Sequence, residues 1–255
     1  MNNLPRHNLL LRSMEHKTRG IIFHTIKYGE SGLVVKIFTE HYGLQSFIVN
    51  SVRGKKSKIK AAVFQPLTLV DLIFQIKENR GLQRIKDIRA MPIYHSIHSD
   101  IVKSSLVLFL NEVLYKSIKE EGHADQPLFD FVFYALQILD LKTELLPNFH
   151  LYFMIQLSRL LGFFPHGECC DATPYFDLRE GTFIASDIEL LITLDATMSR
   201  LLFSFMNANF DTLNSLAMTS AQRKILLHKL LLFFELHLAA FKNLKTPFIL
   251  EEILK

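Results

Sequence analysis

The sequence predicts an α+β protein in which a small five-stranded β-barrel precedes an all-α helical domain. Residues 14–91 contain short runs of strand-like alternation, and turn signals separate them about every 8–12 residues. Residues 92–255 change to the helical period of about 3.6 residues. The charge changes at the same place, because residues 14–90 hold 14 Lys and Arg against 6 Asp and Glu, whereas residues 91–255 hold 13 against 19.

Five strands are expected in the first part of the chain, with turns at residues 28–32, 40–43 and 77–81. The connections leave no room for crossover helices, so the strands must pair mainly in the antiparallel sense. Short strands connected in this way predict a small barrel. The expected strands are Arg19–Lys27, Leu33–Thr39, Leu44–Val49, Leu67–Ile76 and Leu82–Arg89.

The second part of the chain shows several helix signals. Two capping-box patterns, Ser186 with Glu189 and Thr219 with Gln222, mark expected helix starts, and the second precedes a Leu-rich helix over residues 220–243. Residues 163–185 form an irregular segment with a hairpin-like pair at 175–178 and 182–184. Three earlier helices are expected over Val102–Ile118, Pro127–Leu141 and from Asn148 to Gly162.

No secretory signal is visible in the first residues of the chain. Residues 1–13 are expected to be a disordered leader, because the apolar patch Leu9-Leu10-Leu11 is too short for a signal peptide. The most apolar segment, residues 225–241, contains charged residues that a membrane span rarely tolerates, and it is interpreted as a core helix. Two adjacent cysteines, Cys169 and Cys170, form no disulfide framework and fit a reducing compartment. The sequence therefore predicts a cytoplasmic protein without a membrane partner.

The strongest local feature is a basic loop, residues 53–60, between the third and fourth expected strands. It holds five cations within eight residues, and no acidic residue occurs from Ser51 to Val70. Such a cluster can neutralise several phosphates of a nucleic acid. The alternative interpretation is a solvated loop without a function. The phosphate-binding candidates in the loop are Arg53, Lys55, Lys56, Lys58 and Lys60.

Other residues of the expected barrel are candidates for the same surface. Tyr42 lies in a turn, where an exposed ring could stack on a base. Lys36, Arg80 and Arg84 are further candidates for phosphate contacts, and Lys27 and Lys86 could add to them.

The chemistry-bearing residues do not form a catalytic pattern. The sequence contains no phosphate-binding glycine-rich loop and no nucleophile elbow. Cys169 and Cys170 lack the Cys-x-x-Cys spacing of a structural zinc site, so neither zinc nor another cofactor is expected. We therefore expect a protein that binds rather than an enzyme.

An ordered series of short motifs runs through nearly the whole chain from Met14. The first part contains Gly20-Ile21-Ile22, Tyr28-Gly29-Glu30, Val34-Val35-Lys36-Ile37-Phe38-Thr39, Gly43, Val52-Arg53-Gly54-Lys55-Lys56-Ser57 and Gln65-Pro66-Leu67. The second contains Leu128-Phe129-Asp130-Phe131, Asn148-Phe149-His150-Leu151, Leu161-Gly162-Phe163-Phe164-Pro165 and Tyr175-Phe176-Asp177-Leu178-Arg179-Glu180-Gly181-Thr182-Phe183. This series resembles the RecO family of bacterial recombination mediators.

The resemblance implies an OB-fold barrel over residues 14–91 and a helical domain over residues 92–255. It implies binding to single- and double-stranded DNA, annealing of complementary strands, and loading of RecA with RecR as a partner. It also implies docking on the C-terminal tail of single-stranded DNA-binding protein, and a bacterial, nucleoid-associated location. Many family members carry a four-cysteine zinc site near the position of residues 163–185, and this chain departs from that pattern.

Two other classes of function stay open at this point. The barrel could dock only a protein partner, which would make the chain an interaction scaffold. A nuclease would need a cluster of metal-binding carboxylates, and the acidic residues here are scattered along the sequence.

Overall fold

The computed structural model describes residues 15–30, 32–50, 60–76, 81–118, 123–144, 147–186 and 191–254. The chain divides into two compact units, Met1–Met91 and Pro92–Lys255. The expected leader, residues 1–13, lies outside the described residues. Each unit is described separately below.

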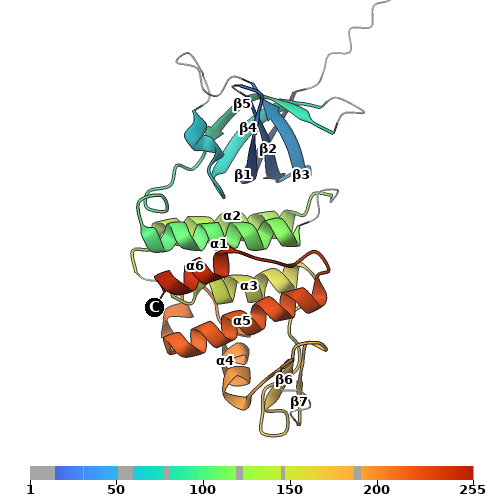
Figure 1. Ribbon diagram of the computed structural model, residues 1–255, viewed down its shortest axis with the longest axis vertical. Coiled ribbons are helices and arrows are strands. Elements are labelled where there is room, and N and C mark those ends of the chain that lie inside the picture. The colour runs from blue at the N-terminus through green and yellow to red at the C-terminus, as the bar shows by residue number, and fades with distance from the viewer. Residues whose placement is uncertain are drawn as a thin grey trace, which may run out of the picture. The chain divides into compact units, whose positions relative to one another are not determined.

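The first unit is a closed barrel with the strand order β1-β2-β3-β5-β4. Figure 1 labels its five strands. Strands β3 and β5 pair in parallel, and the other neighbours pair in the antiparallel sense. This arrangement is an OB-fold barrel, and it confirms the predicted fold class. The strands are β1 (Glu15–Tyr28), β2 (Gly32–Thr39), β3 (Gly43–Val49), β4 (Leu69–Gln75) and β5 (Gln83–Ala90), with a 3-10 helix η1 (Ala61–Phe64) before β4.

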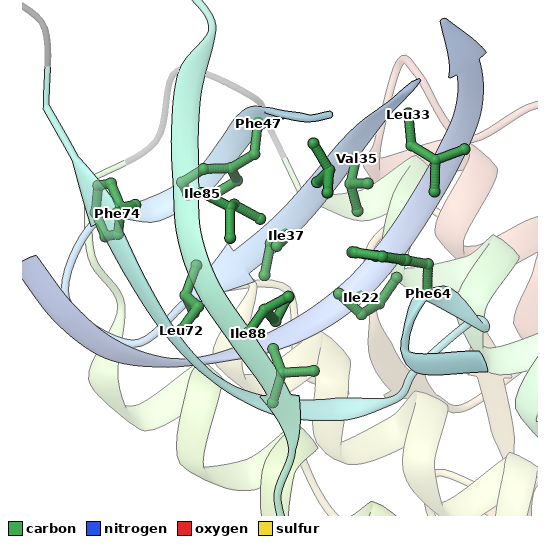
Figure 2. Packing of buried hydrophobic residues seen from close by; sticks show 12 residues of the cluster. Ile22, Leu33, Val35, Ile37, Phe47, Phe64, Leu72, Phe74, Ile85 and Ile88 are labelled. Atoms are coloured by element: carbon green, nitrogen blue, oxygen red, sulfur yellow. The ribbon is translucent and has the colours of Figure 1, made fainter. Parts of the chain in front are cut away.

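Strand alternation explains the barrel core. Successive side chains of a strand point to opposite faces, so every second residue of β2 turns inward. Figure 2 shows Val35 and Ile37 of β2 beside Phe47 of β3, Leu72 of β4 and Ile85 of β5. These side chains are buried, and they fill the barrel with branched aliphatic groups and phenylalanine.

Strand β1 is long enough to pair with both β2 and β4, and its register against β2 shifts between Ile22 and His24. Ile22 points into the barrel core, whereas His24 lies opposite Lys36 of β2. At Gly20 the neighbouring strands pack directly on the backbone, since an added Cβ would lie 2.6 Å from Cγ2 of Ile37. The register shift between Ile22 and His24 is a β-bulge, which bends a strand and re-aims its side chains. Here the bulge determines which side chains in the second half of β1 point outward.

The second unit contains six helices among its described residues, and a small sheet of three strands with the order β7-β6-β8. Helix α3 is buried on all sides and contacts α2, α4 and α5, as expected for the central helix of a bundle. The elements are α1 (Ile101–Ser117), α2 (Gln126–Leu141), α3 (Phe149–Leu160), β6 (Tyr175–Asp177), β7 (Thr182–Ile184), β8 (Thr193–Leu194), α4 (Ala196–Met206), η2 (Leu213–Ser215), α5 (Ser220–His237) and α6 (Thr246–Ile253).

Several helix starts follow the local sequence signals. The side chain of Thr219 accepts a hydrogen bond from the backbone of Gln222, and the side chain of Gln222 accepts one from the backbone of Thr219. This reciprocal pair confirms the predicted capping box of α5. The predicted hairpin is also present as the antiparallel pair β6–β7.

One predicted helix start lies partly outside the described residues, and one helix end differs from the prediction. Ser186 lies in a bend and Glu189 is not described, so their capping box stays a prediction; the next described helix, α4, begins after Asp195, whose carboxylate caps it. Helix α5 ends at His237 and not at residue 243. Beyond that end Phe241 is fully buried and its ring packs on Phe234, which requires the chain to turn back.

Candidate nucleic-acid interface and a pocket in the helical unit

The outward positions of β1, β2, β3 and β5 form one surface of the barrel. The pairing registers place Ile26 beside Val34, Val34 beside Ile48, and Ile48 beside Arg84. A second row places His24 beside Lys36. We call this surface the outer barrel face and define it by His24, Ile26, Tyr28, Val34, Lys36, Ile48 and Arg84.

The outer barrel face combines exposed apolar groups with cations. Ile26 is 50% exposed and Tyr28 is 56% exposed, so this surface presents apolar and aromatic area to solvent. Arg84 is exposed and Lys36 is half-buried. In OB-folds, the face around strands 2 and 3 and the loop between strands 1 and 2 bind oligonucleotides. Tyr28 lies at the end of β1, beside that loop.

The ring of Tyr42 is less exposed than expected for a ring that stacks on a base. It lies in the turn between β2 and β3, at the opposite end of β2 from Tyr28. Its hydroxyl is 2.7 Å from Nδ1 of His16, and its ring packs edge-on against Phe74. Tyr42 is half-buried at the edge of the barrel core, so Tyr28 is the better-exposed ring for base stacking.

Several cations of the barrel form ion pairs. Arg19 pairs with Glu40 at 2.6 Å, Lys86 pairs with Glu15 at 2.6 Å, and Arg89 pairs with Asp71 at 3.1 Å. The last two pairs neutralise part of the positive charge of β5, and the pair with Glu15 makes Lys86 a weaker phosphate-binding candidate than Arg84.

Only part of the predicted basic surface can be placed. Lys60 is exposed immediately before η1, and Lys27 is exposed near the end of β1. Arg53, Lys55, Lys56, Lys58 and Arg80 lie outside the described residues. The structure thus brings Lys36 and Arg84 onto one face with Tyr28, whereas the site role of the basic loop stays a prediction.

The second unit contains a pocket of about 180 Å³ between α3, α5 and α6. Its lining includes apolar side chains of Leu227, Leu250 and Leu254, and the two cations Arg223 and Lys224. The sequence did not point to this pocket, because its walls form only when the consecutive helices α5 and α6 pack together with His150 of the distant helix α3.

His150 of α3 lies in the wall of this pocket and is completely buried. Among the described residues, neither nitrogen of its ring has a hydrogen-bond partner, and its ring packs edge-on against Phe109 of α1. Burial, together with the nearby positive charge of Arg223, lowers the pKa of His150 to about 3. The imidazole is therefore neutral at physiological pH, and Arg223 and Lys224 supply the positive charge of the pocket.

The two cysteines lie in the irregular segment between α3 and β6. Cys170 is exposed, and its sulfur is 3.2 Å from the hydroxyl of Thr173. In the described parts of the chain, no group of three or more His, Cys, Asp or Glu is arranged to hold a metal ion. The expectation of a chain without zinc stays a prediction. None of the described helices is long and apolar enough to cross a membrane.

The fold defines an α+β protein with an N-terminal OB-fold barrel and a C-terminal helical unit. Comparison with protein families gives two matches, recombination protein O N terminal at residues 14–94 and recombination protein O C terminal at residues 98–246. The chain therefore belongs to the RecO family of DNA repair proteins. The family shows that its role lies in DNA repair and recombination.

Curated relatives extend the similarity over nearly the full length. The DNA repair protein RecO of Flavobacterium psychrophilum is 36% identical over 242 residues, which cover 94% of this chain and 99% of the relative. RecO of Bacteroides fragilis is 34% identical over 241 residues, with the same coverage of both chains. RecO of Porphyromonas gingivalis is 28% identical over 240 residues, which cover 92% and 98%.

Proposed function

We propose that this chain is a non-catalytic mediator of DNA repair that binds single- and double-stranded DNA through its OB-fold barrel. In this proposal it anneals complementary strands and, with RecR, helps to load RecA onto DNA covered by single-stranded DNA-binding protein. The observation that carries the proposal is the outer barrel face, where exposed Tyr28 and Ile26 lie on the same surface as Lys36 and Arg84.

The chemistry of this face suits a single strand of DNA. Exposed rings stack on bases of any sequence, and cations beside them contact the phosphates. Arg84 and Lys36 would fix the backbone while Tyr28 stacks on a base. The basic loop, residues 53–60, would add phosphate contacts and lower the repulsion between two strands, which is what annealing requires.

Substitutions on the outer barrel face test this proposal. We expect Tyr28→Ala to weaken binding of a labelled single-stranded oligonucleotide by roughly 5- to 150-fold, since stacking on one base contributes about 1–3 kcal/mol. Tyr28→Phe keeps the ring and should bind like the wild type. Fluorescence anisotropy measures both affinities. Equal affinities of Tyr28→Ala and the wild type would remove Tyr28 from the interface.

A second pair of variants tests the cations with matched charge. Arg84→Ala and Lys86→Ala each remove one positive charge from β5, but Lys86 already pairs with Glu15. We expect the larger loss of affinity from Arg84→Ala. An equal loss would mean that only the overall charge of the barrel matters, and not the outer barrel face.

The pocket between α3, α5 and α6 supports the proposed docking of the C-terminal tail of single-stranded DNA-binding protein. A site for such a tail needs apolar walls and a cation. Leu227, Leu250 and Leu254 provide the walls, and Arg223 and Lys224 provide the positive charge. We therefore assign the tail to this pocket as part of the proposed function.

The assignment predicts that Arg223→Ala weakens binding of a synthetic tail peptide while single-stranded DNA binding stays unchanged. Isothermal titration calorimetry with the peptide and anisotropy with the oligonucleotide separate the two activities.

A further inference from the structure

Helix α6 closes one side of the pocket and is fixed at its start by a side chain of another helix. The carboxylate of Glu112 in α1 accepts hydrogen bonds from the backbone nitrogens of Lys245 and Thr246 at 2.8–3.0 Å. It also accepts one from the hydroxyl of Thr246 at 2.6 Å. Leu250 is the buried residue of α6, whereas Phe248 and Ile249 beside it are exposed, so the helix rests on its neighbours through one apolar side chain and the cap from Glu112.

Glu251 of α6 faces the cations of α5. Its side chain is only 12% exposed, its Oε2 lies 3.0 Å from Nζ of Lys224, and its Oε1 is in hydrogen-bond contact with Nε2 of His228. Burial by itself raises the pKa of Glu251, but the hydrogen bonds from Lys224 and His228 outweigh it and lower the pKa below its usual value. Glu251 is therefore an ionised carboxylate that neutralises one of the two cations in the pocket lining.

The segment of α6 that lines the pocket has the chemistry of the ligand assigned to it. Leu250, Glu251, Glu252 and Leu254 all line the pocket, so two adjacent acidic groups lie there between two apolar ones. An acidic tail with apolar side chains would need the same apolar walls and the same cation.

We propose that α6 competes with the tail from within the chain. In this proposal Glu251 keeps its ion pair with Lys224 until a carboxylate of the incoming tail replaces it. The inference rests on the proposed tail-binding function of the pocket. The tail keeps Arg223 as its first anchor, and the Lys224–Glu251 ion pair must break before a second anchor forms. The carboxylate of Glu251 thereby weakens the binding of a peptide that has one acidic group. It favours a ligand that contacts both Arg223 and Lys224.

The test measures binding of a synthetic peptide with the tail sequence of single-stranded DNA-binding protein from the same organism to the full chain. We expect Glu251→Gln to bind the peptide about two- to fivefold more tightly, the range set by one partly exposed ion pair. Glutamine keeps the shape of glutamate and an acceptor for Lys224. Glu180→Gln is the matched control, because it removes the same charge from an exposed turn between β6 and β7 that does not line the pocket, and we expect no change in peptide affinity.

A double-mutant cycle with Lys224→Gln keeps the result interpretable if Glu251→Gln loosens α6. Where Glu251 acts by occupying Lys224, the gain from Glu251→Gln disappears in the Lys224→Gln background. A gain that persists in that background overturns the inference. Peptide binding by the wild type, with equal or weaker binding by Glu251→Gln, also overturns it and leaves the tail site intact. Absence of binding by both proteins overturns the tail site and the inference together.

Discussion

His150 shows how one buried side chain ties the stability of the helical unit to pH. Its pKa is lowered to about 3 by burial and by Arg223, whereas an unfolded histidine has a pKa near 6.5. The unfolded state therefore binds the proton more readily between these two values. The stability that comes from keeping His150 neutral is complete above about pH 6.5 and is lost as the pH falls toward 3.

We predict that His150→Leu makes stability less dependent on pH in this window. Between pH 7 and pH 5 the wild type should lose about 2 kcal/mol more unfolding free energy than the variant, since each pH unit below 6.5 costs about 1.4 kcal/mol for one group. Urea unfolding followed by the helical circular-dichroism signal measures the difference. Parallel pH profiles of the two proteins would show that His150 does not titrate as proposed.

Single residues also show the limits of sequence reasoning. The basic loop and the stacking candidate Tyr42 could be found from the sequence, but the exposure of the Tyr42 ring could not. Tyr42 lies in a turn by sequence, and yet a hydrogen bond to His16 and packing on Phe74 draw its ring to the core edge. His16 and Tyr42 are 26 positions apart, and Tyr42 and Phe74 are 32 positions apart. No local sequence pattern reveals contacts over such separations.

At the scale of elements, local signals succeeded where no distant partner competed with them. All five strands of the barrel lie where alternation predicted them, and Thr219 starts α5 as its capping box predicted. The capping box of Ser186 and Glu189 falls partly outside the described residues and stays a prediction. The predicted end of α5 at residue 243 was wrong, because the helix ends at His237 and Phe241 is buried against Phe234.

The start of helix α6 is capped by Glu112, a side chain of helix α1, and the contribution of this cap to stability can be tested. Burial raises the pKa of Glu112, but hydrogen bonds from Thr246 and Lys245 outweigh it, so its pKa is lowered overall. We predict that Glu112→Ala costs about 1–2 kcal/mol of stability, the usual loss for an N-cap. Hydrogen exchange should show faster exchange of the α6 amides, while those of α3 keep their protection. Unchanged exchange in α6 would show that Leu250 and its neighbours hold the helix without the cap.

At the scale of the whole molecule, the division of charge is the feature that the sequence revealed best. The basic first part forms the OB-fold barrel, and the acidic second part forms the helical unit. The pocket could not be foreseen, since His150, Arg223 and Leu250 come together only when three helices pack. The family match places the chain among DNA repair proteins, and in the proposed function the barrel binds DNA and the helical unit binds a protein tail.

The salt dependence of single-stranded DNA binding tests the central claim most directly. A logarithmic plot of affinity against salt should be steep for the wild type, because cations of the barrel displace counterions from phosphates. The triple variant Arg53→Ala, Lys55→Ala, Lys56→Ala should bind more weakly, with a slope smaller by about 0.7 for each lost contact, or roughly 2 in total. Tyr28→Ala should weaken binding without changing the slope, because stacking releases no ions. Wild-type binding that does not respond to salt, or a triple variant with the wild-type slope and affinity, would contradict the account.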